Sequence, residues 1–196
     1  MNDYRPLTSE EIEVLKQNNC WAEDWTSVNV GENFKPNFMH RVMLYGEVNI
    51  GGFDKNVEVS QGFVKHSGIN NATLRNVTIG DDCLIENIGN FINNYTIGDD
   101  CYISNISTLE TTEGATYGEG NLVSVLNEVG EGNVILFSDL NSQLAAFMVK
   151  HFSDKELKER IRQLIKTDID TKMPERGRIV NNVKIINTKE ITNCVI

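Results

Sequence analysis

The sequence contains few cysteines, no long apolar run and no surplus of basic charge. Four cysteines in 196 residues are too few for a fold that is stabilised mainly by disulfide bonds. No apolar stretch approaches the roughly 18 residues that span a bilayer, and Met1–Pro6 does not open a secretory signal. Acidic residues outnumber basic ones by 28 to 18, for a net charge of -10, which disfavours bulk nucleic-acid binding. We therefore expect a cytoplasmic protein with neither nucleic-acid nor membrane partners.

A repeat of six residues dominates the middle of the chain. Asn76–Cys83 and Asn94–Cys101 are nearly identical and lie 18 residues apart. A helix would place apolar residues three and four apart, and a half-buried strand would alternate them, so neither explains a period of six. The pattern instead predicts triangular coils of three short parallel strands, stacked on one another. The large residues expected inside these coils are Ile79, Ile85, Phe91, Ile97, Ile103 and Leu109.

Other positions of the repeat carry further expectations. Gly80 and Gly98 directly follow an inward residue, where a tight bend brings backbones close. The small residue four positions after each large one, such as Cys83 or Cys101, is also expected to face inward. The count of six also holds in three separate phases: Val57, Phe63 and Ile69; Tyr117, Val123, Val129 and Ile135; and Ile179, Ile185 and Ile191.

The hexads Ile79–Leu84 and Ile97–Tyr102 resemble the hexapeptide repeat of left-handed parallel β-helix proteins. Within that superfamily the chain is most similar to long β-helix proteins of Bacteroidetes. Those proteins are related to the β-helical domain of sugar-nucleotide pyrophosphorylases. The resemblance implies an all-β fold with added helices, in which a left-handed parallel β-helix spans residues 42–138. Left-handed coiling is implied by the resemblance alone, since it departs from the usual crossover rule.

The segments outside the repeat predict helices. Thr8–Glu11 forms a capping box, so residues 1–41 are expected to be an N-terminal cap with a helix at 9–18. Trp21 and Trp25 are expected to close the first coil with that helix, with ligand stacking as the alternative. Residues 139–172 predict a helical hairpin, with helices at 139–151 and 154–168 capped by Asp139 and Ser153. Residues 173–196 are expected to resume the repeat.

His66 is the single candidate catalytic residue. It precedes Ser67, which is expected inward, so the imidazole should project from the coil. Hexapeptide acyltransferases use a histidine base, and neutral imidazole suits that role. The alternative is a surface or turn-packing histidine. Acyl-coenzyme A is expected as a cofactor only if the protein is an acyltransferase. The sequence shows no other cofactor site and no metal site.

Acidic residues recur at one bend of the repeat. Asp81 with Asp99, and Asp82 with Asp100, are expected to form ladders that are either solvated or bridged by a cation such as calcium. The stacked Cys83 and Cys101 have parallel Cβ directions, which favours two small core residues over a disulfide. Three histidines and no C-x-x-C motif make a zinc site improbable.

Two classes of function stay open from the sequence. The first is a scaffold or ligand-binding segment of a longer protein, with a carbohydrate or sugar nucleotide as ligand. The second is an acyltransferase or sugar-nucleotide-linked transferase that uses His66 as base; a nucleotidyltransferase is disfavoured because no glycine-rich nucleotide loop is present. The oligomeric state also stays open between a trimer on the one hand and a monomer or dimer on the other. Because the repeat stops at Ile196 without a closing cap, we expect further coils beyond it.

Overall fold

The computed structural model describes residues 4–124, 132–151 and 153–196. The chain divides into two compact units. The first unit comprises the residues up to Glu113 together with Arg176–Ile196, and the second is Gly114–Glu175. The described residues are mostly β-structure with few helices, and none of their helices has the length and hydropathy to span a membrane.

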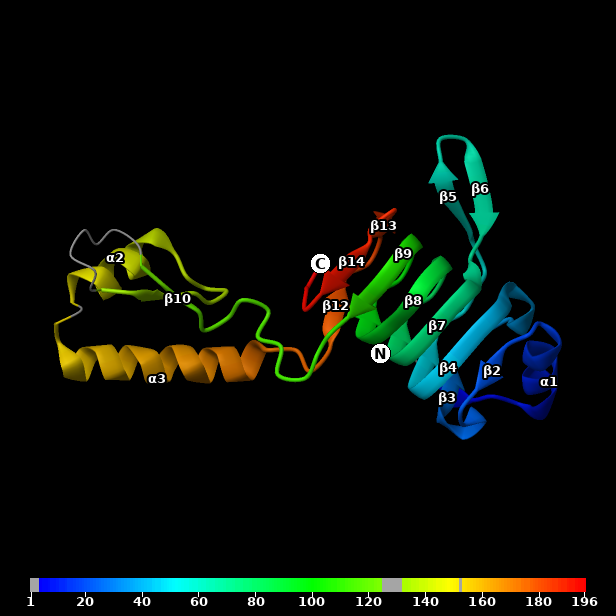
Figure 1. Cartoon of the computed structure of the whole chain (residues 1–196), viewed down its shortest axis with the longest axis horizontal. Helices are drawn as coiled ribbons and strands as arrows, with labels where there is room; N and C mark the ends of the chain where they lie inside the picture. Colours follow the sequence, from blue (N-terminus) through cyan, green and yellow to red (C-terminus); the bar gives the residue numbers. More distant parts are fainter. Residues whose placement is uncertain (1–3, 125–131, 152) are drawn as a thin grey trace. The chain divides into compact units, whose positions relative to one another are not determined.

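The first unit is built around a mixed sheet of ten strands among the described residues (Figure 1). All of its pairings are parallel except that of β1 with β3. The strands are β1 (Arg5–Pro6), β2 (Trp21–Ala22), β3 (Val28–Val30), β4 (Met39–Ile50), β7 (Gly68–Ile79), β8 (Leu84–Ile97), β9 (Tyr102–Glu110), β12 (Gly177–Ile179), β13 (Lys184–Ile186) and β14 (Glu190–Thr192).

The register of these strands defines three stacks of paired segments. The first stack contains β2, residues 42–45, 72–75, 91–93 and 108–110, and β14. The second stack contains β3, residues 48–50, 77–79 and 95–97, and β12. The third stack contains residues 39–40, 68–70, 84–86 and 102–104, and β13. The chain passes from the third stack to the first and then to the second, and repeats this order.

Most bends between the stacks are made by asparagine and aspartate in the left-handed region, whereas Arg41 and Gly46 take this conformation at the two bends along β4. Asparagine and aspartate tolerate positive φ better than other residues with a Cβ. Bends from the third to the first stack lie at Asn71, Asn87, Asn105 and Asn187; those from the first to the second at Asn76, Asn94 and Asn193; those from the second to the third at Asp82, Asp100 and Asn182.

The inward positions of the three stacks form one apolar core. Of the six residues predicted to lie inside, five are buried: Ile79, Ile85, Ile97, Ile103 and Leu109. The prediction for Phe91 was wrong, because Ile92 is fully buried in its place and Phe91 is half-buried on the outside. The cause is a register shift in the β8–β9 pairing between Ile88 and Phe91, which adds a residue to this side of the β8 coil.

An antiparallel hairpin interrupts the repeat where the phase of Val57 and Phe63 was expected. β5 (Asn56–Ser60) pairs with β6 (Phe63–His66), and the hairpin projects from the stacked strands (Figure 1). The Phe63 side chain is 55% exposed, so the prediction that it faces inward was wrong. Glycine at 62, with φ of +74°, permits the tight turn that joins the two strands.

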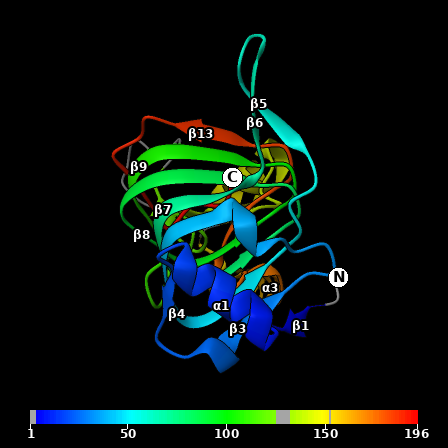
Figure 2. The same cartoon turned by 90° about the vertical axis from the view of Figure 1, so that its right-hand side faces the viewer.

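The N-terminal segment packs on the end of the core (Figure 2). Helix α1 (Ser9–Gln17) has the predicted capping box, with Thr8 as N-cap. Leu15 of α1 is buried in the core and Trp25 packs against it. Trp21 differs from the expectation: its side chain is 50% exposed because β2 pairs in parallel with β4 and turns it to the outer surface.

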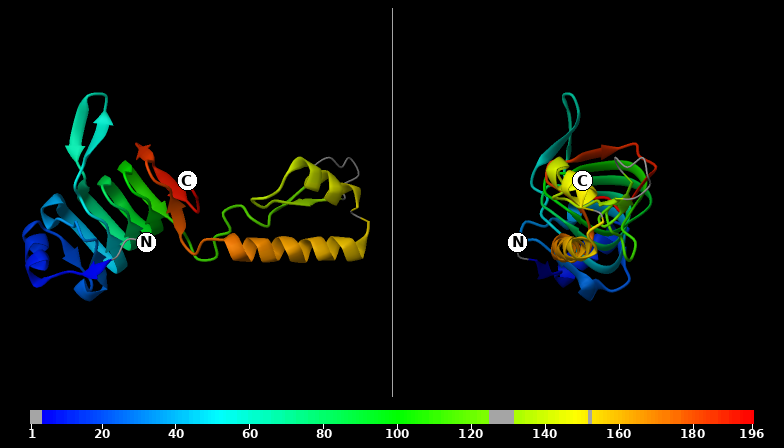
Figure 3. Two further views of the ribbon diagram at one scale, coloured as in Figure 1. Left: turned by 180° about the vertical axis from the view of Figure 1, so that it is seen from behind. Right: turned by 90° about the vertical axis from the view of Figure 1, so that its left-hand side faces the viewer.

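The second unit combines one short hairpin with two helices (Figure 3). β10 (Leu122–Val123) pairs antiparallel with β11 (Val134–Ile135), so the paired residues at 122–123 and 134–135 do not continue the parallel repeat. The phase position Val129 lies outside the described residues. Helix α2 (Ser142–Lys150) is capped by Asn141 and α3 (Lys155–Lys172) by Asp154, in place of the predicted Asp139 and Ser153. Both helices contribute to a separate core of Val134, Met148, Ile165 and Ile169.

Candidate functional site

The outer face of the first stack carries aromatic side chains, of which Trp21 is exposed and Tyr45 and Phe91 are half-buried. Trp21 pairs with Met43, and Tyr45 on the same strand pairs with Arg75, which in turn pairs with Asn93. Because side chains alternate along a strand and inward residues such as Leu44 fill the core, these residues are directed outward. We call the set the aromatic face: Trp21, Met43, Tyr45, Thr73, Arg75, Phe91 and Asn93.

A shallow pocket of about 240 Å³ lies in the middle of the aromatic face. Its lining consists of Tyr45, Thr73, Arg75, Phe91 and Asn93. Two rings, one guanidinium, one amide and one hydroxyl therefore meet on three adjacent strands. The register shift that turns Phe91 outward supplies one of the two rings.

The Trp21 and Tyr45 rings lie side by side at one end of this surface. Their centroids are 5.3 Å apart and their planes are inclined by 59°. This tilted arrangement leaves part of each ring exposed, and Trp21 and Met43 are about half exposed. Exposed apolar side chains gathered on one face are the usual mark of a binding surface, whereas single exposed ones carry no such meaning.

Arg75 is the cationic group of the pocket. Its side chain is exposed, and in the described part of the chain it makes no ion pair. Further along the same row Asn93 pairs with Glu110, so an acidic group follows the arginine on the sheet. The guanidinium can donate to a carboxylate or to sugar hydroxyls, and the rings can stack against an apolar ligand face.

His66, the candidate base, lies elsewhere, at the end of β6. Its ring is stacked on Phe38, with centroids 3.7 Å apart and planes inclined by 9°. Nδ1 lies 2.9 Å from the carbonyl oxygen of Ser67. A neutral imidazole must donate from Nδ1 to that oxygen, which leaves Nε2 as the acceptor. None of the residues that line the pocket of the aromatic face contacts this ring through a described hydrogen bond.

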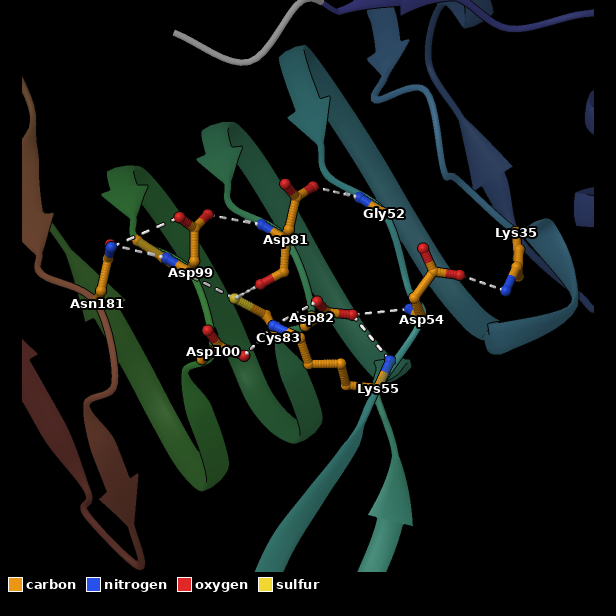
Figure 4. Close-up of polar contacts among 11 residues, drawn as sticks. Lys35, Gly52, Asp54, Lys55, Asp81, Asp82, Cys83, Asp99, Asp100 and Asn181 are labelled. Atoms are coloured by element: carbon orange, nitrogen blue, oxygen red, sulfur yellow. Dashed lines mark hydrogen bonds and ion pairs between the residues drawn. The ribbon is translucent and has the colours of Figure 1, made fainter.

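The acidic bend forms a regular ladder of carboxylate-to-backbone hydrogen bonds (Figure 4). Asp81 Oδ1 accepts from the N–H of Gly52 at 2.7 Å, and Asp99 Oδ1 accepts from the N–H of Asp81 at 2.8 Å. Asn181 Oδ1 continues the ladder by accepting from the N–H of Asp99 at 3.0 Å. Each side chain therefore satisfies a backbone donor in the bend of the neighbouring repeat.

Lys55 bridges the second acidic pair of that bend. Its Nζ lies 3.1 Å from Asp82 Oδ2 and 3.1 Å from Asp100 Oδ1. Asp100 and then Asp82 raise the pKa of Lys55 to about 12. Burial would raise the pKa of Asp82, but the N–H groups of Asp54 and Lys55 together with the Lys55 ammonium lower it overall. The protein thus supplies the bridging cation, and within the described residues no group of three metal-ligating side chains is present.

The stacked cysteines are buried thiols. Cys83 Sγ donates to the carbonyl of Gly98 at 3.0 Å, and Cys101 Sγ donates to that of Val180 at 3.1 Å. Both are free and fully buried, which confirms their prediction as small core residues. The hydrogen bond with Cys101, followed by burial, raises the pKa of the Cys83 thiol, so it stays protonated at neutral pH.

The aromatic face could not be found from the repeat count. That count placed Phe91 inside, and nothing in it distinguished Arg75 or Tyr45 from other variable positions. The signal that would have pointed to it is the 18-residue spacing from Arg75 to Asn93, combined with the outward direction of both.

Comparison with known proteins places the chain in a family. A protein of Treponema pallidum (strain Nichols), described as "Uncharacterized protein", is 26% identical over 187 residues. The alignment covers 90% of this chain but only 26% of that relative, so the chain spans about a quarter of its length. No solved structure matches significantly. The family model described as "Domain of unknown function (DUF4954)" matches residues 4–196, and the chain belongs to this family.

Proposed function

We propose that the first unit is a left-handed parallel β-helix of hexapeptide repeats and that it serves as a rigid scaffold for ligand binding. Three observations support a β-helix: the constant order in which the chain visits the stacks, the 18-residue register of residues 84–88 with 102–106, and the left-handed residues at the bends. Handedness comes from the resemblance to hexapeptide-repeat proteins. Such a stack presents side chains on fixed strands, which suits recognition of an extended ligand.

The ligand that best fits the aromatic face is a carbohydrate with an acidic group. The observation that carries this proposal is the pocket in which Tyr45 and Phe91 flank Arg75. Sugar rings have apolar C–H faces that stack on aromatic rings and hydroxyl edges that hydrogen-bond to amide and hydroxyl groups. Arg75 adds a partner for a carboxylate, since guanidinium and carboxylate form paired hydrogen bonds.

An array of immobilised neutral and acidic oligosaccharides tests this function. We expect the full chain to bind acidic members, and Tyr45→Ala or Phe91→Ala to weaken binding by about 10-fold, corresponding to roughly 1–1.5 kcal/mol for a lost aromatic contact. Phe63→Ala is the matched control, because Phe63 is an exposed ring outside the aromatic face. Arg75→Gln should remove the preference for acidic sugars, whereas Arg178→Gln should not. Absence of binding to every glycan, or equal weakening by Phe63→Ala, would contradict the proposal.

An acyltransferase activity is the second candidate. The observation that favours it is the Nδ1 contact of His66 with Ser67 O, which leaves Nε2 free to accept a proton. Under this proposal acyl-coenzyme A is the donor and His66 deprotonates the acceptor. Saturable binding of acetyl-coenzyme A, together with acetyl transfer that His66→Ala abolishes and His40→Ala leaves intact, is the expected result. Lack of coenzyme binding would leave the scaffold as the function.

We further propose a cytoplasmic location and a homo-oligomer, either a trimer or a dimer, with a monomer as the alternative that the sequence leaves open. Light scattering measures the oligomeric state directly and distinguishes these three states. We also propose that this chain serves as a scaffold or ligand-binding segment of a longer protein, such as the Treponema relative.

A further inference from the structure

The second unit contains a pocket of about 450 Å³, which is within the size range of small-molecule sites. Part of its lining is apolar and includes Ile135, Met148 and Ile161. The lining also contains cationic and polar side chains from the start of α3 and the segment before it. They are His151, Ser153, Lys155, Lys158 and Arg162.

The three cations lie on one surface of α3. Lys155, Lys158 and Arg162 are spaced by three and four residues, so their side chains are neighbours on the helix. All three are exposed, and within the described residues none of them forms an ion pair. In a chain of net charge -10, three cations without a carboxylate partner are an unusual local surplus.

The acidic side chains of the same turns are engaged elsewhere. Asp154 Oδ1 accepts from the N–H of Leu157 at 3.0 Å as the helix cap. Glu156 pairs with Arg160 at 2.7 Å, and Glu159 accepts from Gln163 at 3.3 Å. No acidic residue is among the described residues that line the pocket. The positive potential there is therefore not neutralised by its own helix, and the N-terminal end of the helix dipole adds to it.

We propose that this pocket binds a small phosphate ester whose phosphate contacts Lys158 and Arg162 and whose apolar or aromatic body lies against Met148 and Ile161. A guanidinium and an ammonium a turn apart match the several oxygens of a phosphate. The Ser153 hydroxyl can donate a further hydrogen bond. The apolar wall distinguishes this site from a simple anion site, because it shields part of the ligand from water. This site lies within one unit and does not depend on the proposed function of the aromatic face.

Isothermal titration of the full chain with ADP, inorganic pyrophosphate and adenosine tests the proposal. We expect ADP to bind saturably, pyrophosphate to bind less tightly, and adenosine to bind weakest. Lys158→Gln combined with Arg162→Gln should weaken ADP binding by at least about 10-fold, the effect of losing one charge-assisted hydrogen bond. Binding should also weaken as salt is raised, since exposed charges are screened.

The matched control combines Lys150→Gln with Lys166→Gln, which removes the same charge from exposed positions outside the pocket lining. Its ADP affinity should stay within about twofold of the parent. Equal weakening in both double variants would show a diffuse charge effect and overturn the site, as would the absence of binding by any probe. Equal affinities for ADP and pyrophosphate would overturn the role of the apolar wall. Circular dichroism should show unchanged helix content, since all four positions are exposed.

Discussion

The carboxylate of Asp99 accepts a hydrogen bond from the backbone N–H of Asp81, at 2.8 Å and across 18 residues of sequence. The same relation links Asp81 to Gly52 and Asn181 to Asp99. Aspartate and asparagine at this position of the repeat therefore join the bends that follow neighbouring parallel strands. The near identity of Asn76–Cys83 and Asn94–Cys101 is thus explained by hydrogen bonds between these bends as well as by local turn preference.

Asp82→Asn should destabilise the first unit by about 1–3 kcal/mol, the range for hydrogen bonds to a charged group. Asp82 accepts from the N–H groups of Asp54 and Lys55 at 2.7 and 2.9 Å. Asparagine tolerates the positive φ of this position, so the change removes charge without adding backbone strain. Urea unfolding measures the difference, with Glu32→Gln as an exposed control.

The same substitution should change the pH dependence of stability. The pKa of Asp82 is lower in the folded protein than in the unfolded chain, so its contribution is present above the unfolded value of roughly 3.9. That contribution is lost as the pH falls through the folded pKa, below about 4. Between pH 6 and 3 the parent should therefore lose more stability than Asp82→Asn. Parallel pH profiles for the two proteins would contradict this assignment.

Gly80→Ala should destabilise the protein by about 2 kcal/mol or more, because overpacking against backbone is costly. A Cβ at position 80 would lie 2.7 Å from the carbonyl carbon of Gly98, and one at Gly98 would lie 2.7 Å from the nitrogen of Asn181. Gly62→Ala meets nothing within 4 Å and should cost only about 1 kcal/mol through its positive φ. Thermal unfolding that ranks Gly62→Ala as the worse variant would refute the close approach of the coils.

Glu86 should hold the β5–β6 hairpin against the third stack. Its buried carboxylate accepts from Lys65 Nζ at 2.9 Å, Tyr102 Oη at 3.1 Å and Ser104 Oγ at 3.4 Å. Glu86→Gln should speed amide exchange in the hairpin and cost about 1–3 kcal/mol. Glu32→Gln, which changes an exposed carboxylate outside the hairpin, is the control for hydrogen exchange and should leave Lys65 and its neighbours protected.

Thiol labelling should distinguish the cysteines. Cys20, Cys83 and Cys101 are buried, whereas Cys194 is partly exposed. We expect one thiol to react rapidly with a neutral alkylating reagent at pH 7.5 and all four to react in denaturant. Mass spectrometry should identify the fast site as Cys194. Rapid labelling of Cys83 would contradict its buried, protonated state.

Inward residues were predictable because a period of six leaves no other regular arrangement, and five of the six core predictions in residues 79–109 were confirmed. The prediction for Phe91 was wrong because Phe91 and Ile92 are adjacent and both large and apolar. Their spacing alone does not reveal the one-residue register shift that turns Ile92 inward. Trp21 was misplaced for a related reason. Whether the Trp21 side chain points inward or outward can be inferred only once the pairing of β2 with β4 is known. The cations of α3 were likewise invisible as a site, because their shared pocket depends on the hairpin β10–β11 and on α2.

The second unit is inserted in the sequence between strands that pair with each other, namely β8 and β9 before it and β12 and β13 after it. Asp81 and Asp99 are bonded across 18 residues, but the next bond of the ladder, from Asp99 to Asn181, spans 82. Closing the longer loop costs roughly 1 kcal/mol more in chain entropy if the intervening residues are disordered. An inserted segment that folds first shortens the effective loop, and non-local pairing then becomes faster. Folding of residues 114–175 should therefore precede docking of Gly177–Ile196, which gives this fold a preferred order of assembly.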